Sequence, residues 1–204
     1  MNQTKPYCAL LTIFTFSAIF FLTAITATAQ QMDVAFGVNT MTAPSASDAS
    51  GNHLPQSLNG GAYLGFSADA VLFRNFGVQG EFAWRASRGE YLNVQPYRPT
   101  FWDFNAMYLP RVAKHTYFEL LAGLGSESTR YYQPFQICDF YTCRNYVTIN
   151  HFMGHFGAGL RLYPIRSLFI RPEAHLYLVH DNQEFSSGHA VRYGMSIGYT
   201  FGGR

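Results

Sequence analysis

The feature that most constrains this chain is a strict alternation of apolar and polar side chains in segments of about ten residues. In residues 168–181, Ile170 and Pro172 fall on one face of an extended chain, and Arg171 and Glu173 fall on the other. Side chains of a β-strand point alternately to the two faces of its sheet. The sequence therefore predicts long strands with an apolar environment on one side and fixed polar partners on the other.

The same period-two pattern recurs along the chain. It predicts eight strands, at 32–40, 61–72, 77–87, 101–109, 116–125, 151–162, 168–181 and 190–201. A transmembrane strand needs about 9 to 11 residues, whereas most globular strands have about 5 or 6. The predicted strands match the transmembrane length.

The connections between these strands are long and short in turn. The long ones are 41–60, 87–100, 126–146 and 181–189, and the short ones are 73–76, 110–115 and 163–167. This order is typical of an up-and-down barrel with tight turns at one end and display loops at the other. We predict an all-β fold, an eight-stranded antiparallel up-and-down transmembrane β-barrel with both chain ends at the tight-turn end.

Alternation alone does not say which face points inward, because a soluble lipocalin-type barrel hides its apolar face. Here the polar face is rich in glycine, which suits an eight-stranded interior that side chains fill. It also carries both signs of charge, which can pair when buried. We predict that it lines the lumen and that His155 joins a lumen charge network made of Glu81, Arg85, Glu119, Arg161, Arg171, Glu173, His175 and Arg192. Ordinary surface charges are the alternative.

The apolar face carries aromatic side chains near the ends of the strands. Transmembrane barrels place such rings at the two membrane interfaces, as girdles. The predicted girdle residues are Trp84, Trp102, Tyr108, Tyr193, Tyr199 and Phe201. Their positions favour a lipid-facing exterior.

The chain begins with a segment typical of a secretory signal peptide. Lys5 precedes an apolar stretch at 9–25, and residues 27–29 read Ala-Thr-Ala, an A-x-A cleavage pattern. We therefore expect residues 1–29 to be a cleaved signal peptide and 30–204 to be one barrel domain. An uncleaved N-terminal anchor is the alternative.

Cys138 and Cys143 lie five positions apart in a long connection. In an exported protein such a pair most often forms a disulfide, and closing so short a loop stabilises by roughly 2 kcal/mol. The surrounding segment 126–146 is our predicted surface contact, and packing against neighbouring loops is the alternative. Its aromatic residues are Tyr131, Tyr132, Phe135, Phe140, Tyr141 and Tyr146.

The predicted signal peptide, the eight alternating segments and the final YGMSIGYTF resemble the small bacterial outer-membrane β-barrel proteins, the OmpA-like or porin-family barrel domain. The resemblance covers about residues 30–204. It implies an outer-membrane location, contact with outer-membrane lipid and recognition by the barrel assembly machinery during biogenesis. Family members usually finish on an aromatic residue, which here corresponds to Phe201, although three residues follow it.

The resemblance implies a non-enzymatic role, with a polar, largely plugged lumen, at most a narrow pore, and no cofactor. The charge is nearly balanced, at 14 Lys and Arg against 12 Asp and Glu. No basic stripe suggests nucleic acid. One alternative is an envelope-lipid-modifying enzyme of the lipid A deacylase type, and another is a soluble periplasmic ligand-binding barrel. The enzyme needs a Ser/His/acid set, for which the candidates are His180, Glu184, Ser186, Ser187 and His189.

A metal site is not predicted. His151 and His155 have a spacing that could chelate zinc on a helix. On a strand they lie roughly 13 Å apart, which is too far for one ion.

Overall fold

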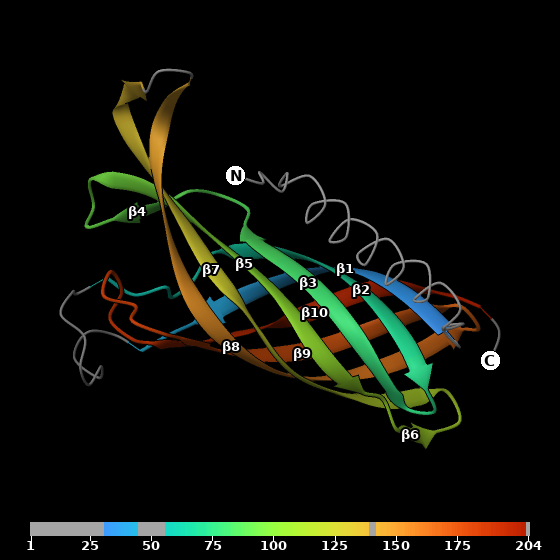
Figure 1. Cartoon of the computed structure of the whole chain (residues 1–204). Coiled ribbons are helices and arrows are strands. Elements are labelled where there is room, and N and C mark those ends of the chain that lie inside the picture. The colour runs from blue at the N-terminus through green and yellow to red at the C-terminus, as the bar shows by residue number, and fades with distance from the viewer. Residues whose placement is uncertain (1–30, 45–55, 139–141, 203–204) are drawn as a thin grey trace, which may run out of the picture.

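All eight predicted strands form in the computed structural model, and they close into one antiparallel barrel (Figure 1). The structure describes residues 31–44, 56–138 and 142–202, so the predicted signal peptide lies outside the described residues. The barrel strands are β1 (Gln31–Thr42), β2 (Ala62–Phe73), β3 (Phe76–Arg85), β5 (Gln95–Tyr108), β7 (Thr116–Cys138), β8 (Cys143–Ile165), β9 (Leu168–Val179) and β10 (His189–Phe201).

Each strand pairs with its neighbour in sequence, and pairing of β1 with β10 closes the cylinder. Two three-residue strands bring the described strands to ten: β4 (Gly89–Tyr91) pairs with β5, and β6 (Arg111–Ala113) pairs with β7. Met32 lies opposite Phe201. Both ends of the described barrel therefore lie at the tight-turn end, as predicted.

Among the described residues, no helix is long and apolar enough to cross a membrane.

The alternation of side chains places the apolar residues outside. Phe82, Leu120 and Phe156 are 45%, 43% and 52% exposed, whereas Glu81 and Glu119 are buried in the lumen. The predicted girdle aromatics also lie on the outer face. The apolar face therefore points outward, which excludes a lipocalin-type barrel with an apolar interior.

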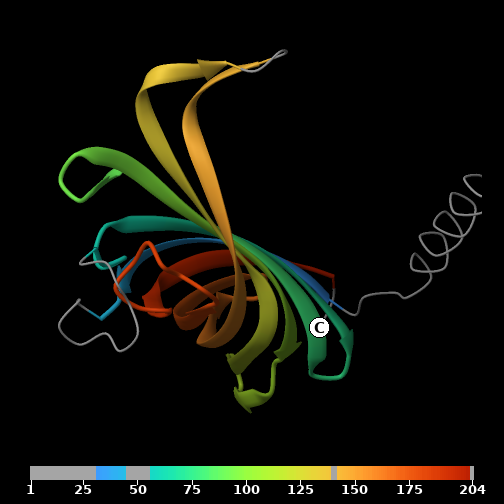
Figure 2. The same cartoon turned by 60° about the vertical axis from the view of Figure 1, so that its left-hand side comes forward.

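The prediction of a long loop at 126–146 is wrong, because most of this segment is strand. Strands β7 and β8 each run for 23 residues, and their ladder continues past the barrel to the pair Cys138 and Cys143. We call the part beyond the barrel, residues 126–138 and 143–150, the β7–β8 extension. Figure 2 shows that it leaves the loop end of the barrel and bends away from it. The ladder persists because cross-strand pairs such as Tyr132 and Tyr146 replace the apolar alternation.

The predicted connection 87–100 is also more ordered than expected. It contains β4 and the first residues of β5, which form a short hairpin in which Gly89 lies opposite Tyr97. Tyr91 and Tyr97 pack edge to face at 6.1 Å between ring centroids. Aromatic packing thus extends the sheet beyond the apolar band here as well.

Pro172, inside β9, cannot donate to a ladder. It lies opposite Met195 of β10. On the other side, the β8–β9 ladder pairs Glu173 with Gly159 and next pairs Ile170 with Leu162. The interruption on the β8 side accommodates the missing N–H, and Pro172 itself lies on the outer face.

Inward glycines make room for larger lumen side chains. A Cβ added to Gly198 would lie 2.1 Å from the ring of Phe169, which is fully buried. We expect Gly198→Ala to lower the free energy of unfolding by about 1 to 3 kcal/mol, the usual effect of overpacking. Urea unfolding of the refolded barrel in detergent measures this.

Gly80→Ala is the matched control, because Gly80 lies on the outer face and the nearest atom to its added Cβ is 3.5 Å away, on Phe104. Equal unfolding midpoints for the two alanine variants would contradict the expectation.

Candidate functional site: the charged lumen of the barrel

The half of the lumen nearer the tight turns is organised around Arg161 of β8. This fully buried guanidinium contacts three carboxylates from three different strands: Asp33, Asp69 and Glu119. The Nη2 atom of Arg161 lies 2.6 Å from Asp69 Oδ2 and also contacts the sulfur of Met107 at 3.3 Å. One cation therefore binds β1, β2 and β7 across the lumen.

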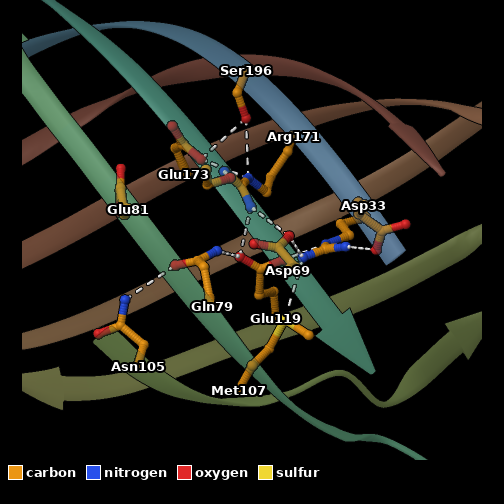
Figure 3. A network of polar contacts seen from close by, with 12 residues as sticks. Asp33, Asp69, Gln79, Glu81, Asn105, Met107, Glu119, Arg171, Glu173 and Ser196 are labelled. Carbon is orange, nitrogen blue, oxygen red and sulfur yellow. Dashed lines mark hydrogen bonds and ion pairs between the residues drawn. The ribbon is translucent and has the colours of Figure 1, made fainter. Parts of the chain in front are cut away.

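Arg171 of β9 continues this cluster towards the centre. Its Nη1 donates to Glu119 Oε1 at 2.9 Å, and its Nε lies 2.6 Å from Glu173 Oε2. The same Nε also donates to the hydroxyl oxygen of Ser196 at 3.0 Å, and Nη2 donates to that of Ser67 at 3.1 Å. Figure 3 shows Arg171 with Glu119 and Glu173. Because Glu119 also contacts Arg161, the two cations belong to one network.

A bridge of amides leads from this cluster to a pair of histidines. Gln79 donates to Glu119 at 3.4 Å and accepts from Asn105 at 3.2 Å. Asn105 Oδ1 lies 2.8 Å from His155 Nδ1, and His155 Nε2 lies 2.9 Å from His175 Nδ1. A continuous chain of polar contacts therefore runs along the lumen.

The third buried cation, Arg192 of β10, contacts Glu81. The other oxygen of Glu81, Oε2, lies 3.4 Å from His175 Nδ1. Asp103 Oδ1 lies 3.1 Å from His155 Nδ1. These contacts place two imidazoles among carboxylates at the level of Arg192.

Seven of the eight predicted lumen residues lie in this network, together with His155. The exception is Arg85, which lies nearer the loop end, where its Nη1 donates to the hydroxyl of Tyr97 at 2.9 Å. The sequence prediction did not include Asp33, Asp69 or Asp103. All three occupy polar positions of their strands, so the same alternation that selected Glu81 could have found them.

Apolar and aromatic side chains fill the lumen on both sides of the charged network. At the loop end, Phe101 stacks on Tyr177 at 4.8 Å between ring centroids, and Tyr63 lies 6.2 Å from Phe101. At the tight-turn end, Tyr163 packs on Phe169 at 5.4 Å. Polar and apolar layers together occupy the interior.

We compared this architecture and its sequence with those of known proteins. No protein-family model and no curated protein sequence matches the chain. Three solved structures are similar to it over 84% of its length: Ail, the attachment invasion locus protein of Yersinia pestis, in complex with the heparin analogue sucrose octasulfate (TM-score 0.55, 14% identity, 98% of that chain), the N-terminal β-barrel domain of Pseudomonas aeruginosa OprF (0.53, 13%, 98%) and Neisserial surface protein A (0.57, 7%, 96%). The fold is that of the small outer-membrane β-barrels.

The loop end of this outer-membrane-type barrel holds the residues considered for an enzyme. Ser187 Oγ lies 2.8 Å from His189 Nδ1, but Glu184 pairs with His151 at 2.9 Å. Ser186 Oγ donates to the carbonyl of Pro44 at 2.6 Å. His180 is exposed. The structure therefore brings Ser187 and His189 together and directs the neighbouring carboxylate to another histidine.

Tyr91 of β4 connects this region to the rest of the loop end. Its hydroxyl donates to the backbone carbonyl of Glu184 at 2.8 Å. Burial and the nearby Glu184 carboxylate raise the pKa of Tyr91, so it remains a neutral donor at physiological pH.

The aromatic residues predicted as a contact surface lie in different surroundings. Tyr131 is buried and packs on Tyr91 at 5.1 Å between ring centroids, whereas Phe135 is 62% exposed. Tyr132 and Tyr146 lie opposite each other and are stacked upon by Arg88 and Arg130. Phe140 and Tyr141 lie outside the described residues. The disulfide Cys138–Cys143 closes the described part of the extension.

Proposed function

We propose that the chain is a non-enzymatic outer-membrane protein that displays the β7–β8 extension at the cell surface as a contact for partners. One observation carries this proposal. From Leu124, the last outward apolar residue of β7 in the barrel, the strand continues to Cys138. These fourteen residues correspond to up to about 45 Å of extended chain. A segment of that length reaches well beyond the lipid.

The outer face of the barrel supports the membrane location. On β7 its side chains change from apolar Leu120 and Leu124 to polar Ser126 and Ser128, and on β8 they change from Phe152 to Asn150. An apolar band that ends at the same level on neighbouring strands suits contact with outer-membrane lipid. We also propose that residues 1–29 are a removed signal peptide and that the barrel assembly machinery recognises β10 through Phe201.

The similar solved structures support a surface role without defining it. Ail was solved in complex with a heparin analogue. By analogy, we propose that the β7–β8 extension is the part of this chain that a ligand or partner contacts. Its most exposed described aromatic residue, Phe135, is the first candidate for an anchor.

The packed lumen supports a barrel that conducts little or nothing. Three buried arginines form ion pairs across it, and aromatic layers lie on both sides of them. An eight-stranded barrel is only wide enough for side chains to fill its interior. We therefore expect no steady conductance in planar bilayers.

Surface display is tested with an epitope of a few residues inserted after Asp139. Antibody should label intact cells that carry this insertion. An epitope inserted after Arg166, in the tight turn between β8 and β9, should be labelled only after the outer membrane is permeabilised. Labelling with the opposite pattern, or recovery of the protein in the soluble fraction, would overturn the proposal.

The absence of catalysis is tested with the purified barrel and lipopolysaccharide. We expect no release of fatty acid. Hydrolysis that is lost in Ser187→Ala would instead support the lipid-modifying alternative, because Ser187 Oγ is within hydrogen-bond distance of His189.

The disulfide is expected to stabilise the extension and not the barrel. Replacing both Cys138 and Cys143 with serine should destabilise the tip by about 2 kcal/mol, because the bond closes a loop of five residues. The barrel should keep its urea midpoint, since the tip of the extension beyond Tyr131 pairs only with itself, whereas residues 126–131 also pair with β5. Hydrogen exchange resolved along β7 measures both effects, and equal exchange at the tip in the two proteins would refute this expectation.

A further inference from the structure

We propose that the lumen contains a binding site for one divalent transition-metal ion such as Zn²⁺, formed by Glu81, His155 and His175. One ligand atom from each of these buried residues lies within 4.8 Å of the others. They come from three strands, β3, β8 and β9. The inference goes beyond a display function, because it concerns the interior of the barrel.

The distances suit a small ion. His155 Nε2 lies 2.9 Å from His175 Nδ1, and that atom lies 3.4 Å from Glu81 Oε2. An ion about 2.1 Å from each ligand in tetrahedral geometry holds its ligand atoms about 3.4 Å apart. Only small shifts are therefore needed to place these three atoms around one ion. Three protein ligands leave one position for water.

The backbone register produces this convergence. His155 lies opposite Tyr177, and His175 lies opposite Gly157, so the two histidines are diagonal neighbours on β8 and β9. Such neighbours are within reach of long side chains. Gly157 leaves space beside the imidazole, because an added Cβ there would lie 3.2 Å from His175 Nδ1.

The ring nitrogen of His155 that would not bind the ion has two acceptors, and that of His175 faces a carboxylate beyond hydrogen-bond distance. His155 Nδ1 lies 2.8 Å from Asn105 Oδ1 and 3.1 Å from Asp103 Oδ1. His175 Nε2 lies 3.6 Å from Glu173 Oε2. Metal-binding histidines usually direct their second nitrogen at a carboxylate or carbonyl, which fixes the tautomer. A proton on His155 Nδ1 leaves Nε2 free to bind.

The charge of the lumen favours a cation. Within the barrel, the described charged side chains that are buried comprise six carboxyl groups and three guanidinium groups: Asp33, Asp69, Glu81, Asp103, Glu119 and Glu173, and Arg161, Arg171 and Arg192. Unbalanced buried charge is unfavourable. A divalent ion would offset two of the three excess negative charges.

Glu81 has one oxygen available for the ion. Its Oε1 contacts Arg192, whereas its buried Oε2 has no hydrogen-bond partner. Two arginines oppose a cation here, Arg192 on Glu81 and Arg171 on Glu173. The three carboxylates around the histidine pair, Glu81, Asp103 and Glu173, still exceed them by one charge. The ring of Tyr177 lies 5.0 Å from that of His155 and separates the pair from the loop end.

The test uses the mature full-length chain, purified without a histidine tag, refolded in detergent with or without Zn²⁺, and washed with EDTA. We expect one zinc per folded barrel and a higher urea midpoint for the zinc-refolded protein. Refolding with Co²⁺ should give the strong visible absorption of a tetrahedral site. Failure of the wild-type protein to retain either ion would overturn the proposal and would leave the display function untouched.

Variants assign the site. His175→Gln and His155→Gln should each reduce retained zinc at least tenfold, whereas His180→Gln, at an exposed histidine, should retain it fully. Heat-modifiable migration shows whether each variant has folded. If a variant does not fold, X-ray absorption of the wild-type zinc protein decides the point, with two imidazoles and one carboxylate expected at about 2.0 to 2.2 Å. Full retention in folded His175→Gln, or a shell without imidazole, would refute the site.

Discussion

Replacing Arg161 with methionine is expected to lower the free energy of unfolding by about 3 to 5 kcal/mol, the usual effect of removing one partner of a buried ion pair. The effect should reach the upper end of this range, because the change leaves three buried carboxylates, Asp33, Asp69 and Glu119, without their shared cation. Urea unfolding of the refolded barrel, followed by tryptophan fluorescence and by heat-modifiable migration, measures the loss.

Two further variants separate charge from packing. Arg166→Met changes an exposed arginine in the tight turn after β8 and should leave the unfolding midpoint unchanged. Adding Asp33→Asn and Asp69→Asn to Arg161→Met should recover part of the stability, since neutral amides tolerate the loss of the cation. A wild-type midpoint for Arg161→Met alone would show that the network does not hold the strands together.

Replacing Phe156 with arginine should make folding into lipid vesicles less favourable by about 2 to 4 kcal/mol, the cost of an arginine near the bilayer midplane of a barrel. Phe156 is 52% exposed on the outer face of β8, opposite Ala122 and Leu176. A charge at this position would have to lie in hydrocarbon. Reversible folding into vesicles, titrated with urea, gives the difference.

Thr148→Arg is the matched control, on the same strand and the same outer face but in the β7–β8 extension. Thr148→Arg should change the free energy of folding by only about 0 to 1 kcal/mol, because the cost of a charged side chain becomes small near the membrane interface. Equal effects of the two substitutions would mean that the outer face is not in contact with lipid, and the outer-membrane assignment would fail with it.

The alternation of residues in the sequence predicted the strands of the barrel, and the glycines and mixed charges of the polar face, with the aromatic residues of the apolar face, predicted which face points inward. Successive side chains of a strand point to opposite faces of the sheet, so Ile170 must lie on the face opposite to that of Arg171. The β7–β8 extension could not be predicted in the same way. Beyond Leu124 the outer face of β7 carries the polar residues Ser126 and Ser128, so the apolar alternation stops there, although Glu127 remains buried on the inner face and the ladder continues.

The partners within the lumen depend on the stagger of the strands around the cylinder, which a single sequence does not reveal. The alternation places Asp33 and Asp69 on the polar faces of their strands, but the sequence of neither strand shows that both side chains contact Arg161. The sequence places His155 and His175 in one lumen network but does not show that they are neighbours, for the same reason. For a metal site it suggests only His151 and His155 of one strand, whereas His155 contacts His175 on the next strand.

The contact between Arg161 and Asp33 joins residues 128 positions apart, across the lumen and not along a ladder. We expect it to form only when β1 meets β10, because these two paired strands lie farthest apart in the sequence and their seam should close last. Before that moment an open sheet would present unneutralised acids and bases to acyl chains, at a high free energy. The chain should therefore cross the bilayer as a nearly finished cylinder, and half-inserted intermediates should be scarce.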